Sequence, residues 1–145
     1  MSDALLLDSQ LCFALYAASR TVTAAYTPHL KPLGLTYPQY LVLLVLWERD
    51  GVRVSQLGER LYLDSATLTP LLKRMQAQGV LERRRSQEDE RVVELFLTPH
   101  GKRLKRRAEE IPSNVFANSG LSVKQARELK TSLQALTRRL REQPD

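Results

Sequence analysis

A single cysteine and a series of tyrosines are the most reactive side chains of this 145-residue sequence. On a helix that turns 100° per residue, Tyr16 and Tyr26 each lie within ~40° of the direction of Cys12. Oxidants react with the thiolate, and a free cysteine with a pKa of ~8.5 is mostly protonated at neutral pH. Tyrosine hydroxyls that donate hydrogen bonds to the sulfur would favour the thiolate. The residues alone leave two interpretations open: an inert cysteine in an apolar core, which is the more common case, and a redox-active cysteine beside tyrosines.

The distance along this helix predicts a second copy of the chain. Fourteen residues rise ~21 Å, so Tyr26 cannot touch Cys12 of its own straight helix. Contact requires the opposing helix of another subunit. The same helix carries a narrow apolar stripe with alternating four- and three-residue spacing, formed by Leu11, Leu15, Ala18, Val22 and Ala25. The last predicted helix has a similar stripe, so we predict a homodimer built from both chain ends, and the alternative is that the stripes pack on each other within one chain.

A second group of residues could bind nucleic acid. Residues 54–79 have the pattern of two short helices joined by a tight turn, and a charged hairpin follows, which is the order of a winged helix-turn-helix. When the apolar residues of the second helix are assigned to the core, its open face carries Ser65, Thr67, Thr69, Lys73 and Arg74. Hydroxyls and cations can bond bases and phosphates, although any amphipathic helix also has a polar face.

The hairpin after this helix has nearly balanced charge, so its role must depend on geometry. Asp89 and Arg91 lie two residues apart near the turn, and the carboxylate can brace the guanidinium so that it projects into a minor groove. Arg84, on the first strand, is a further candidate DNA contact, and a solvated loop is the alternative for the whole hairpin. The basic run from Lys102 to Arg107 is interpreted as a solvent-exposed helix face.

The elements that position these residues are mostly helical. The sequence predicts helices from Asp8, as N-cap, to about residue 31, from the Thr36–Gln39 capping box to about 48, at 54–61 and 65–79, and from Thr98 and Ser122 onwards. The prediction is one mainly α domain over 1–145, with a two-stranded β wing. Its DNA-binding lobe spans about 50–98, and dimerisation helices span about 8–31 and 99–141.

Composition excludes several classes of site. The chain has 22 Lys and Arg against 16 Asp and Glu, a net charge of +6. One cysteine cannot form an internal disulfide, and with His29 and His100 far apart in sequence we expect no metal site and no cofactor. The longest apolar run is far shorter than the ~20 residues that cross a bilayer. We therefore expect a cytoplasmic protein without a membrane partner.

Two stretches carry a family resemblance. LDSATLTPLLKRMQAQGVLERRRSQEDERVVELFLTPHG resembles the recognition helix and wing of the multiple-antibiotic-resistance-regulator (MarR) family, including the pair Asp89 and Arg91. LCFALYAASRTVTAAYTPHLKPLGLTYPQYLVLLVLWE resembles the organic hydroperoxide resistance regulators (OhrR) of that family. The resemblance places the peroxide-sensing cysteine at Cys12 and its tyrosine partners at Tyr26 and Tyr37. It implies a dimeric repressor, not an enzyme, that leaves double-stranded operator DNA when an organic hydroperoxide oxidises that cysteine.

The sequence departs from part of the group at one point. Some members carry a second cysteine that forms a disulfide with the sensor, whereas Ala117–Ser119, where it would be expected, holds none. This implies a one-cysteine type, in which a low-molecular-weight thiol traps oxidised Cys12 or the sulfur is oxidised further. Two other hypotheses remain open here: a MarR-type repressor released by a small apolar or phenolic ligand, with Cys12 incidental, and a thiol peroxidase.

Overall fold

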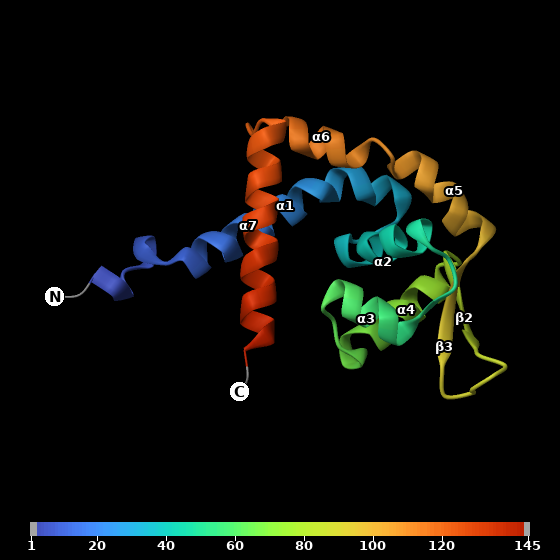
Figure 1. The fold of residues 1–145 in the computed structure, drawn as a ribbon. Coiled ribbons are helices and arrows are strands. Elements are labelled where there is room, and N and C mark those ends of the chain that lie inside the picture. The colour runs from blue at the N-terminus through green and yellow to red at the C-terminus, as the bar shows by residue number, and fades with distance from the viewer. Residues whose placement is uncertain (1–2, 144–145) are drawn as a thin grey trace. The chain divides into compact units, whose positions relative to one another are not determined.

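The structure, a computed structural model, describes residues 3–143. Its contacts divide the chain into two compact units, Met1–Glu109 and Glu110–Asp145 (Figure 1). Helices dominate both units, and the first unit also holds a small antiparallel sheet. The fold is the mainly α winged helix-turn-helix that the sequence predicts.

The first long helix, α1, spans Leu11–Leu30 and follows two short 3₁₀ turns, η1 (Asp3–Leu5) and η2 (Leu7–Ser9). The prediction that Asp8 caps this helix is wrong, because Asp8 lies in η2 and Gln10 is the N-cap residue. The Gln10 side-chain amide donates to the Leu6 carbonyl, which ties the helix start to the preceding turn. Only Leu30 of α1 is buried, so most of the helix lies open to solvent in the single chain. It leads into the turn η3 (Lys31–Leu33).

Helix α2 (Tyr37–Glu48) forms the centre of the first unit. The predicted capping box at its start is confirmed, because Thr36 accepts from the Gln39 amide and the Gln39 side chain accepts from the Thr36 amide. Half of its residues are buried. The sequence predicts burial on all sides because the helix has no polar face, and this is wrong for one side, where Leu44 is 39% exposed. Figure 1 shows α2 between α5 on one side and the pair α3 and α4 on the other, and α2 contacts all three.

The helix-turn-helix consists of α3 (Val54–Leu61) and α4 (Ser65–Ala77). Tyr62 ends α3 in a left-handed conformation, with φ of 56°, and this reverses the chain within three residues. Asp64 then caps α4 by accepting from the Thr67 amide. Pro70 lies inside α4, and Leu68, Leu71, Leu72 and Met75 point into the core as predicted.

The sheet has three strands, β1 (Val52–Arg53), β2 (Leu81–Arg85) and β3 (Val93–Leu97), in the order β1-β3-β2. Strands β2 and β3 form the predicted wing, with Leu81 opposite Leu97 and Arg85 opposite Val93. The sequence predicted only these two strands. The two-residue β1 is too short to give an alternating pattern, and it pairs with the base of β3.

Helix α5 (Pro99–Ala108) begins directly after the wing with the predicted cap at Thr98, whose hydroxyl accepts from the Gly101 amide. Gly101 is required by close packing, because an added Cβ would lie only 2.1 Å from the Val80 carbonyl oxygen. The indole of Trp47, at the end of α2, donates to the Gly101 carbonyl at 2.9 Å. The start of α5 is therefore fixed against both the core and the base of the wing.

The second unit contains α6 (Ile111–Ala117) and α7 (Val123–Glu142). The predicted capping box of α7 is confirmed, with Ser122 and Gln125 bonding reciprocally. Helix α6 was not predicted as a separate element. No residue of α7 is buried, and Val123, Leu129 and Leu140 are among its exposed apolar residues. Among residues 3–143, no helix is long and apolar enough to span a membrane.

Candidate functional site

Cys12 lies in the first turn of α1 with its side chain exposed. Within the described residues it has no hydrogen-bond partner. Helix geometry separates it from Tyr26 by almost the length of α1. The single chain therefore holds the sulfur on an open helix face, where a partner could reach it.

The predicted tyrosine partners meet in one cluster. The rings of Tyr26 and Tyr37 are 5.0 Å apart in an edge arrangement, and Tyr40 lies 5.6 Å from Tyr26 and 6.0 Å from Tyr37. Burial raises the pKa of Tyr26 and, together with the nearby Tyr26 hydroxyl, that of Tyr37. Burial and the two neighbouring tyrosines raise the pKa of Tyr40 to about 12. The phenols therefore stay protonated at neutral pH, as a hydrogen-bond donor to a thiolate must.

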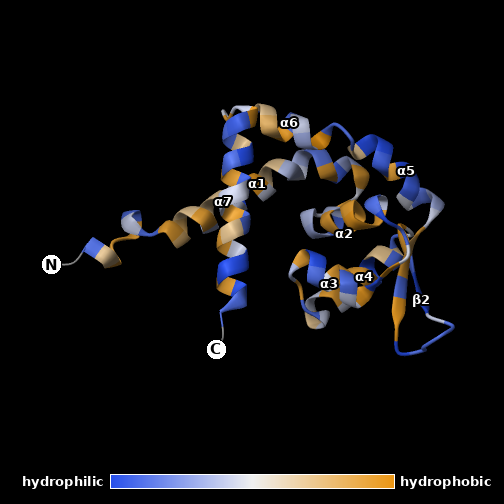
Figure 2. Cartoon of the chain, in the orientation of Figure 1, coloured by the Kyte–Doolittle hydropathy of each residue, from blue (hydrophilic) through white to orange (hydrophobic). Residues whose placement is uncertain are grey.

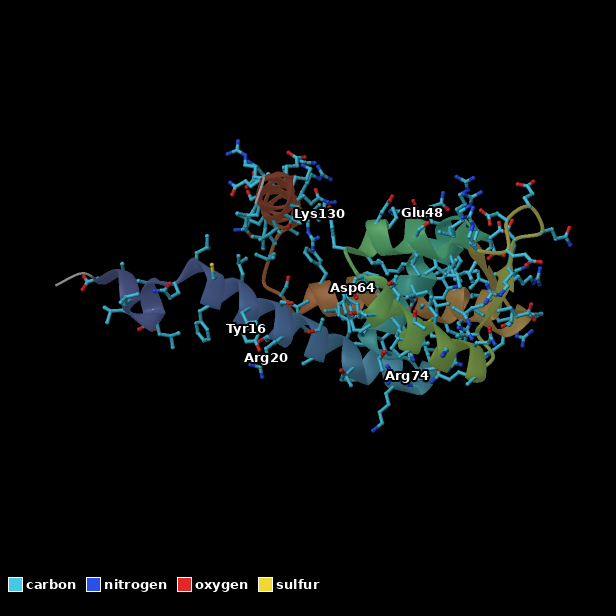
Figure 3. All side chains as sticks on the ribbon, turned by 90° about the horizontal axis from the view of Figure 1, so that it is seen from below. Tyr16, Arg20, Glu48, Asp64, Arg74 and Lys130 are labelled. Atoms are coloured by element: carbon cyan, nitrogen blue, oxygen red, sulfur yellow. The ribbon has the colours of Figure 1, made fainter. Side chains whose placement is uncertain are left out.

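Tyr16 lies one turn from Cys12 and is not part of this cluster. Its ring is largely exposed, and the guanidinium carbon of Arg20 lies 5.3 Å from the ring centre (Figure 3). Cation–π contacts of this kind hold a cation at a helix surface. The sequence prediction missed this role of Arg20, although its four-residue spacing from Tyr16 was a visible signal.

Aromatic contacts continue from the tyrosine cluster towards the wing. Tyr40 is buried, and its ring lies 6.4 Å from that of Trp47. Trp47 in turn bonds the Gly101 carbonyl, and the nearby Thr98 hydroxyl donates to the Gly79 carbonyl at the end of the recognition helix. A continuous series of contacts therefore connects Tyr26 and Tyr37 with the end of α4 and the base of the wing.

The recognition helix α4 presents the predicted polar face. All five of its candidate side chains are exposed: Ser65, Thr67, Thr69, Lys73 and Arg74. Figure 3 shows Asp64 and Arg74 at opposite ends of this helix. Hydrogen bonds from the Thr67 amide and hydroxyl lower the pKa of Asp64, so its carboxylate stays ionised as the cap.

The tip of the wing has the predicted brace. Arg91 Nε and Nη2 contact the two oxygens of Asp89 at 3.1 and 3.2 Å, while the Arg91 side chain remains 90% exposed. The hydrogen bond from the Arg91 side chain, followed by that from its backbone amide, lowers the pKa of Asp89. Arg84 is less available than predicted, because it pairs with Glu82 at 2.8 Å and lies over the Phe96 ring.

A pocket of about 350 Å³ separates the recognition helix from the wing. Arg53, Thr69, Arg83 and Arg91 are among its lining residues. Arg83 also bonds the side chain of Gln76 in the last full turn of α4, which links the wing to the recognition helix. The sequence prediction did not name Arg53 or Arg83 as DNA contacts. Arg53 reaches this pocket because β1 pairs with β3, and Arg83 because β2 pairs with β3.

Known proteins are similar to this chain in sequence and fold. Residues 24–108 match the family model described as "Transcriptional regulator SarA/Rot". The organic hydroperoxide resistance transcriptional regulator of Bacillus subtilis is 50% identical over 134 residues, which are 92% of this chain and 91% of that protein. A MarR transcriptional regulator from Methanosarcina mazei is 25% identical with a TM-score of 0.75, over 87% of this chain and 92% of its own.

The chain belongs to the MarR family, in its organic hydroperoxide resistance group. A further member, AbfR of Staphylococcus epidermidis, is known in two DNA-bound states. Reduced AbfR bound to DNA is 34% identical, with a TM-score of 0.83 over 97% of this chain and 96% of its own. Overoxidised AbfR bound to DNA is 38% identical, with a TM-score of 0.74 over 93% and 99%.

Membership in this MarR group decides among the hypotheses drawn from the sequence. These relatives are transcriptional regulators, so the protein is a regulator and not a thiol peroxidase. The hydroperoxide-resistance regulator of Bacillus subtilis and the overoxidised state of AbfR favour a peroxide signal over a small apolar ligand.

Proposed function

We propose that this MarR-family protein is a dimeric repressor that binds operator DNA and releases it when an organic hydroperoxide oxidises Cys12. One observation carries the proposal. Cys12 lies exposed in the first turn of α1, while Tyr26 near the other end of α1 and Tyr37 at the start of α2 form a protonated pair. An antiparallel α1 from a second copy would bring each sulfur to the tyrosine pair of its partner.

Exposed apolar side chains support the dimer. On α1 they include Leu11, Phe13 and Val22, and on α7 they include Leu129 and Leu140. An apolar stripe of this size on a helix is stabilised when a partner helix covers it. We therefore assign dimerisation to the exposed apolar faces of α1 and α7, within the predicted ranges of about 8–31 and 99–141, and DNA binding to the lobe of about 50–98. The polar outer faces of α5 and α7 are not part of this interface.

The DNA contacts follow from the exposed face of α4 and the tip of the wing. Ser65, Thr67 and Thr69 can bond base edges or phosphates in the major groove. Lys73 and Arg74 can form ion pairs with phosphates of the DNA backbone. Arg91, which Asp89 holds in place, can enter a minor groove. Arg84 has a smaller part, because Glu82 neutralises much of its charge.

Two balanced steps describe the redox signal. The Cys12 thiolate attacks one peroxide oxygen, the O–O bond breaks, and the leaving alkoxide takes a proton to give a sulfenic acid and an alcohol. A low-molecular-weight thiol then displaces water from the sulfenic acid and forms a mixed disulfide. The added thiol is too bulky for a packed helix interface, so it separates the sulfur from the tyrosine pair.

We assign the release of operator DNA to the mixed disulfide and not to further oxidation of the sulfur, and a structure of AbfR supports this choice. Its overoxidised form is bound to DNA, so oxygen atoms on sulfur are compatible with DNA binding in that protein. The chain has no second cysteine, so an external thiol must supply the second sulfur. Displacement of the tyrosine pair would act on the wing through Tyr40 and Trp47, whose contacts end at the start of α5.

The test uses an operator duplex selected by this protein from a random-sequence library. Its affinity is measured by fluorescence anisotropy before and after one equivalent of cumene hydroperoxide, with and without cysteine as the thiol, and Cys12 is followed by mass spectrometry. We expect affinity to fall by about 10- to 100-fold, in step with the mixed disulfide. Cys12→Ser should bind equally well and not respond. Release from Cys12→Ser would contradict the sensor assignment, and release by hydroperoxide alone would contradict the role of the thiol.

A further inference from the structure

The outer surface of α5 carries an uncommon concentration of positive charge. The α5 basic face consists of five exposed residues, Lys102, Arg103, Lys105, Arg106 and Arg107. The helix contains no acidic residue, and Figure 2 shows it mostly in the hydrophilic colour. Among the described residues, none of the five forms an ion pair, and Arg107 makes one long hydrogen bond to the Pro32 carbonyl.

Helix stability does not account for this face. Cations in the last turn of a helix are favourable, which suits Lys105, Arg106 and Arg107. Lys102 lies in the first turn, where an acidic residue would be favoured instead. The pairs Lys102–Arg106 and Arg103–Arg107 are four residues apart and repel each other. Helix stability therefore does not explain Lys102 or these like-charge pairs, which indicates a role outside the fold.

The α5 basic face also determines the net charge of the protein. The DNA-binding lobe, residues 50–98, holds eight Lys and Arg and eight Asp and Glu, so its net charge is zero. Without the five residues of α5, the 22 basic residues of the chain fall to 17, against 16 acidic ones. Proteins gain sequence-independent affinity for DNA from unpaired cations. Five cations of residues 50–98 also form no ion pair among the described residues, namely Arg53, Lys73, Arg74, Arg83 and Arg85, but the acidic residues of the lobe balance their charge. Helix α5 has five such cations and no acidic residue.

The composition of the face indicates phosphate as its ligand. Protein interfaces have an apolar centre, and membrane-bound helices insert large apolar side chains. Here the apolar side of α5, formed by Leu104 and Ala108, is buried, and none of the exposed large apolar residues belongs to α5. Phosphate contacts need only cations and hydrogen-bond donors, which this face supplies.

The position of α5 separates this face from the operator. Helix α2 lies between α5 and the recognition helix, and it contacts α5 on one side and α4 on the other (Figure 1). A duplex held by α4 and the wing therefore leaves the α5 basic face free.

We propose that the α5 basic face is a second DNA-binding surface, which holds the phosphates of another duplex while α4 and the wing hold the operator. This proposal rests on the proposed function in one respect, the binding of operator DNA by α4 and the wing. Because DNA is the polyanion that surrounds a bound repressor, a neighbouring segment is the ligand this face meets at the highest local concentration. The surface binds without sequence preference and lets the protein bridge two duplexes or transfer between them.

The experiment measures capture of a second duplex. The protein is first saturated with the unlabelled selected operator, and a labelled duplex without that sequence is then titrated at several salt concentrations. We compare wild type with K102Q/R103Q/K105Q/R106Q, which keeps Arg107 and its bond to Pro32. We expect wild type to capture the second duplex and the variant to bind it at least ~10-fold more weakly, with a salt slope smaller by about 3–4. Operator affinity should change less than about twofold.

Removal of four charges from α7 provides the matched control. R127Q/K130Q/R138Q/R139Q loses the same charge from exposed positions and should still capture the second duplex. The melting temperature of the α5 variant should not fall, since its like-charge repulsion is removed. Equal loss in both variants, full capture by the α5 variant, or no capture by operator-bound wild type would overturn the proposal. Failure of the proposed function would appear separately, as no binding of the operator itself.

Discussion

At the scale of single residues, the account depends on phenols that remain hydrogen-bond donors. The sequence could place Cys12, Tyr16 and Tyr26 on one helix face, because helix geometry needs no tertiary information. It could not show that Tyr40 packs on both sensing tyrosines, since that contact depends on how α2 crosses α1. The packing matters chemically, because it raises the pKa of all three hydroxyls.

The raised tyrosine pKa values predict a dependence on alkaline pH. In the unfolded chain these tyrosines ionise near pH ~10, whereas in the folded chain Tyr40 resists ionisation up to about pH 12. Their contribution to stability is therefore complete below pH ~10 and is lost as the pH rises from there to about 12. The free energy of unfolding in urea should fall over this range. Tyr40→Phe should weaken the fall, and an unchanged slope in that variant would contradict the pKa assignment.

The brace at the wing tip gives a second prediction at this scale. Arg91→Ala should lower operator affinity by ~1–3 kcal/mol, because it removes the side chain held towards the minor groove. Unfolding should be almost unaffected, since the side chain is 90% exposed. Fluorescence anisotropy measures the operator affinity, and sedimentation velocity measures whether the variant remains a dimer. Arg84→Ala is the comparison variant and should lose less, because Glu82 already binds that guanidinium. An equal loss in both would remove the special role of Arg91.

At the scale of elements, the sequence located most helices because their starts carry local signals. Thr36 with Gln39 and Ser122 with Gln125 form the predicted capping boxes. Elements without such signals were missed. Strand β1 has only two residues and exists through pairing with β3, and α6 has seven residues and no side-chain cap. The start of α1 was misplaced because Gln10, through its bond to Leu6, and not Asp8, ends the preceding turn.

Close packing where α5 meets the wing predicts a strong effect of one methyl group. Gly101→Ala would place a Cβ 2.1 Å from the Val80 carbonyl oxygen, so the helix or the strand must move. We expect a loss of ~2–3 kcal/mol in unfolding free energy, more than at the control position. Gly79→Ala is the control: its φ of 76° costs an alanine ~1 kcal/mol, but nothing lies within 4 Å of the new Cβ. An equal or smaller loss at Gly101 would contradict the packing.

The contacts from the tyrosine pair to the wing predict that a change at Trp47 leaves the oxidation of Cys12 intact but weakens the release of DNA. Trp47→Phe keeps an aromatic ring against Tyr40 but removes the donor to the Gly101 carbonyl. Operator affinity of the reduced protein and the oxidation rate of Cys12 should stay within about twofold of wild type. The loss of affinity on oxidation should shrink by about 5-fold or more. If the variant releases DNA as fully as wild type, the Trp47 contact has no part in the response.

At the scale of the whole molecule, the account requires two chains. The sequence indicated this through narrow apolar stripes at both ends, and the structure leaves α1 and α7 with exposed apolar side chains. Leu129→Asp should therefore weaken the dimer and, through it, operator affinity, with little effect on the helix-turn-helix. Sedimentation velocity measures the dimer, and a variant that stays fully dimeric at micromolar concentration would exclude Leu129 from the interface.

The central claim is that each Cys12 is activated by the tyrosines of the other subunit, and a heterodimer tests it most directly. One subunit carries Cys12→Ser and the other carries Y26F/Y37F, so the single remaining cysteine faces intact tyrosines only across the interface. The measurement is the oxidation rate of that cysteine by cumene hydroperoxide, followed by mass spectrometry. The account predicts the wild-type rate in this heterodimer and a rate at least ~10-fold slower in the Y26F/Y37F homodimer. Equally slow oxidation in both would contradict it.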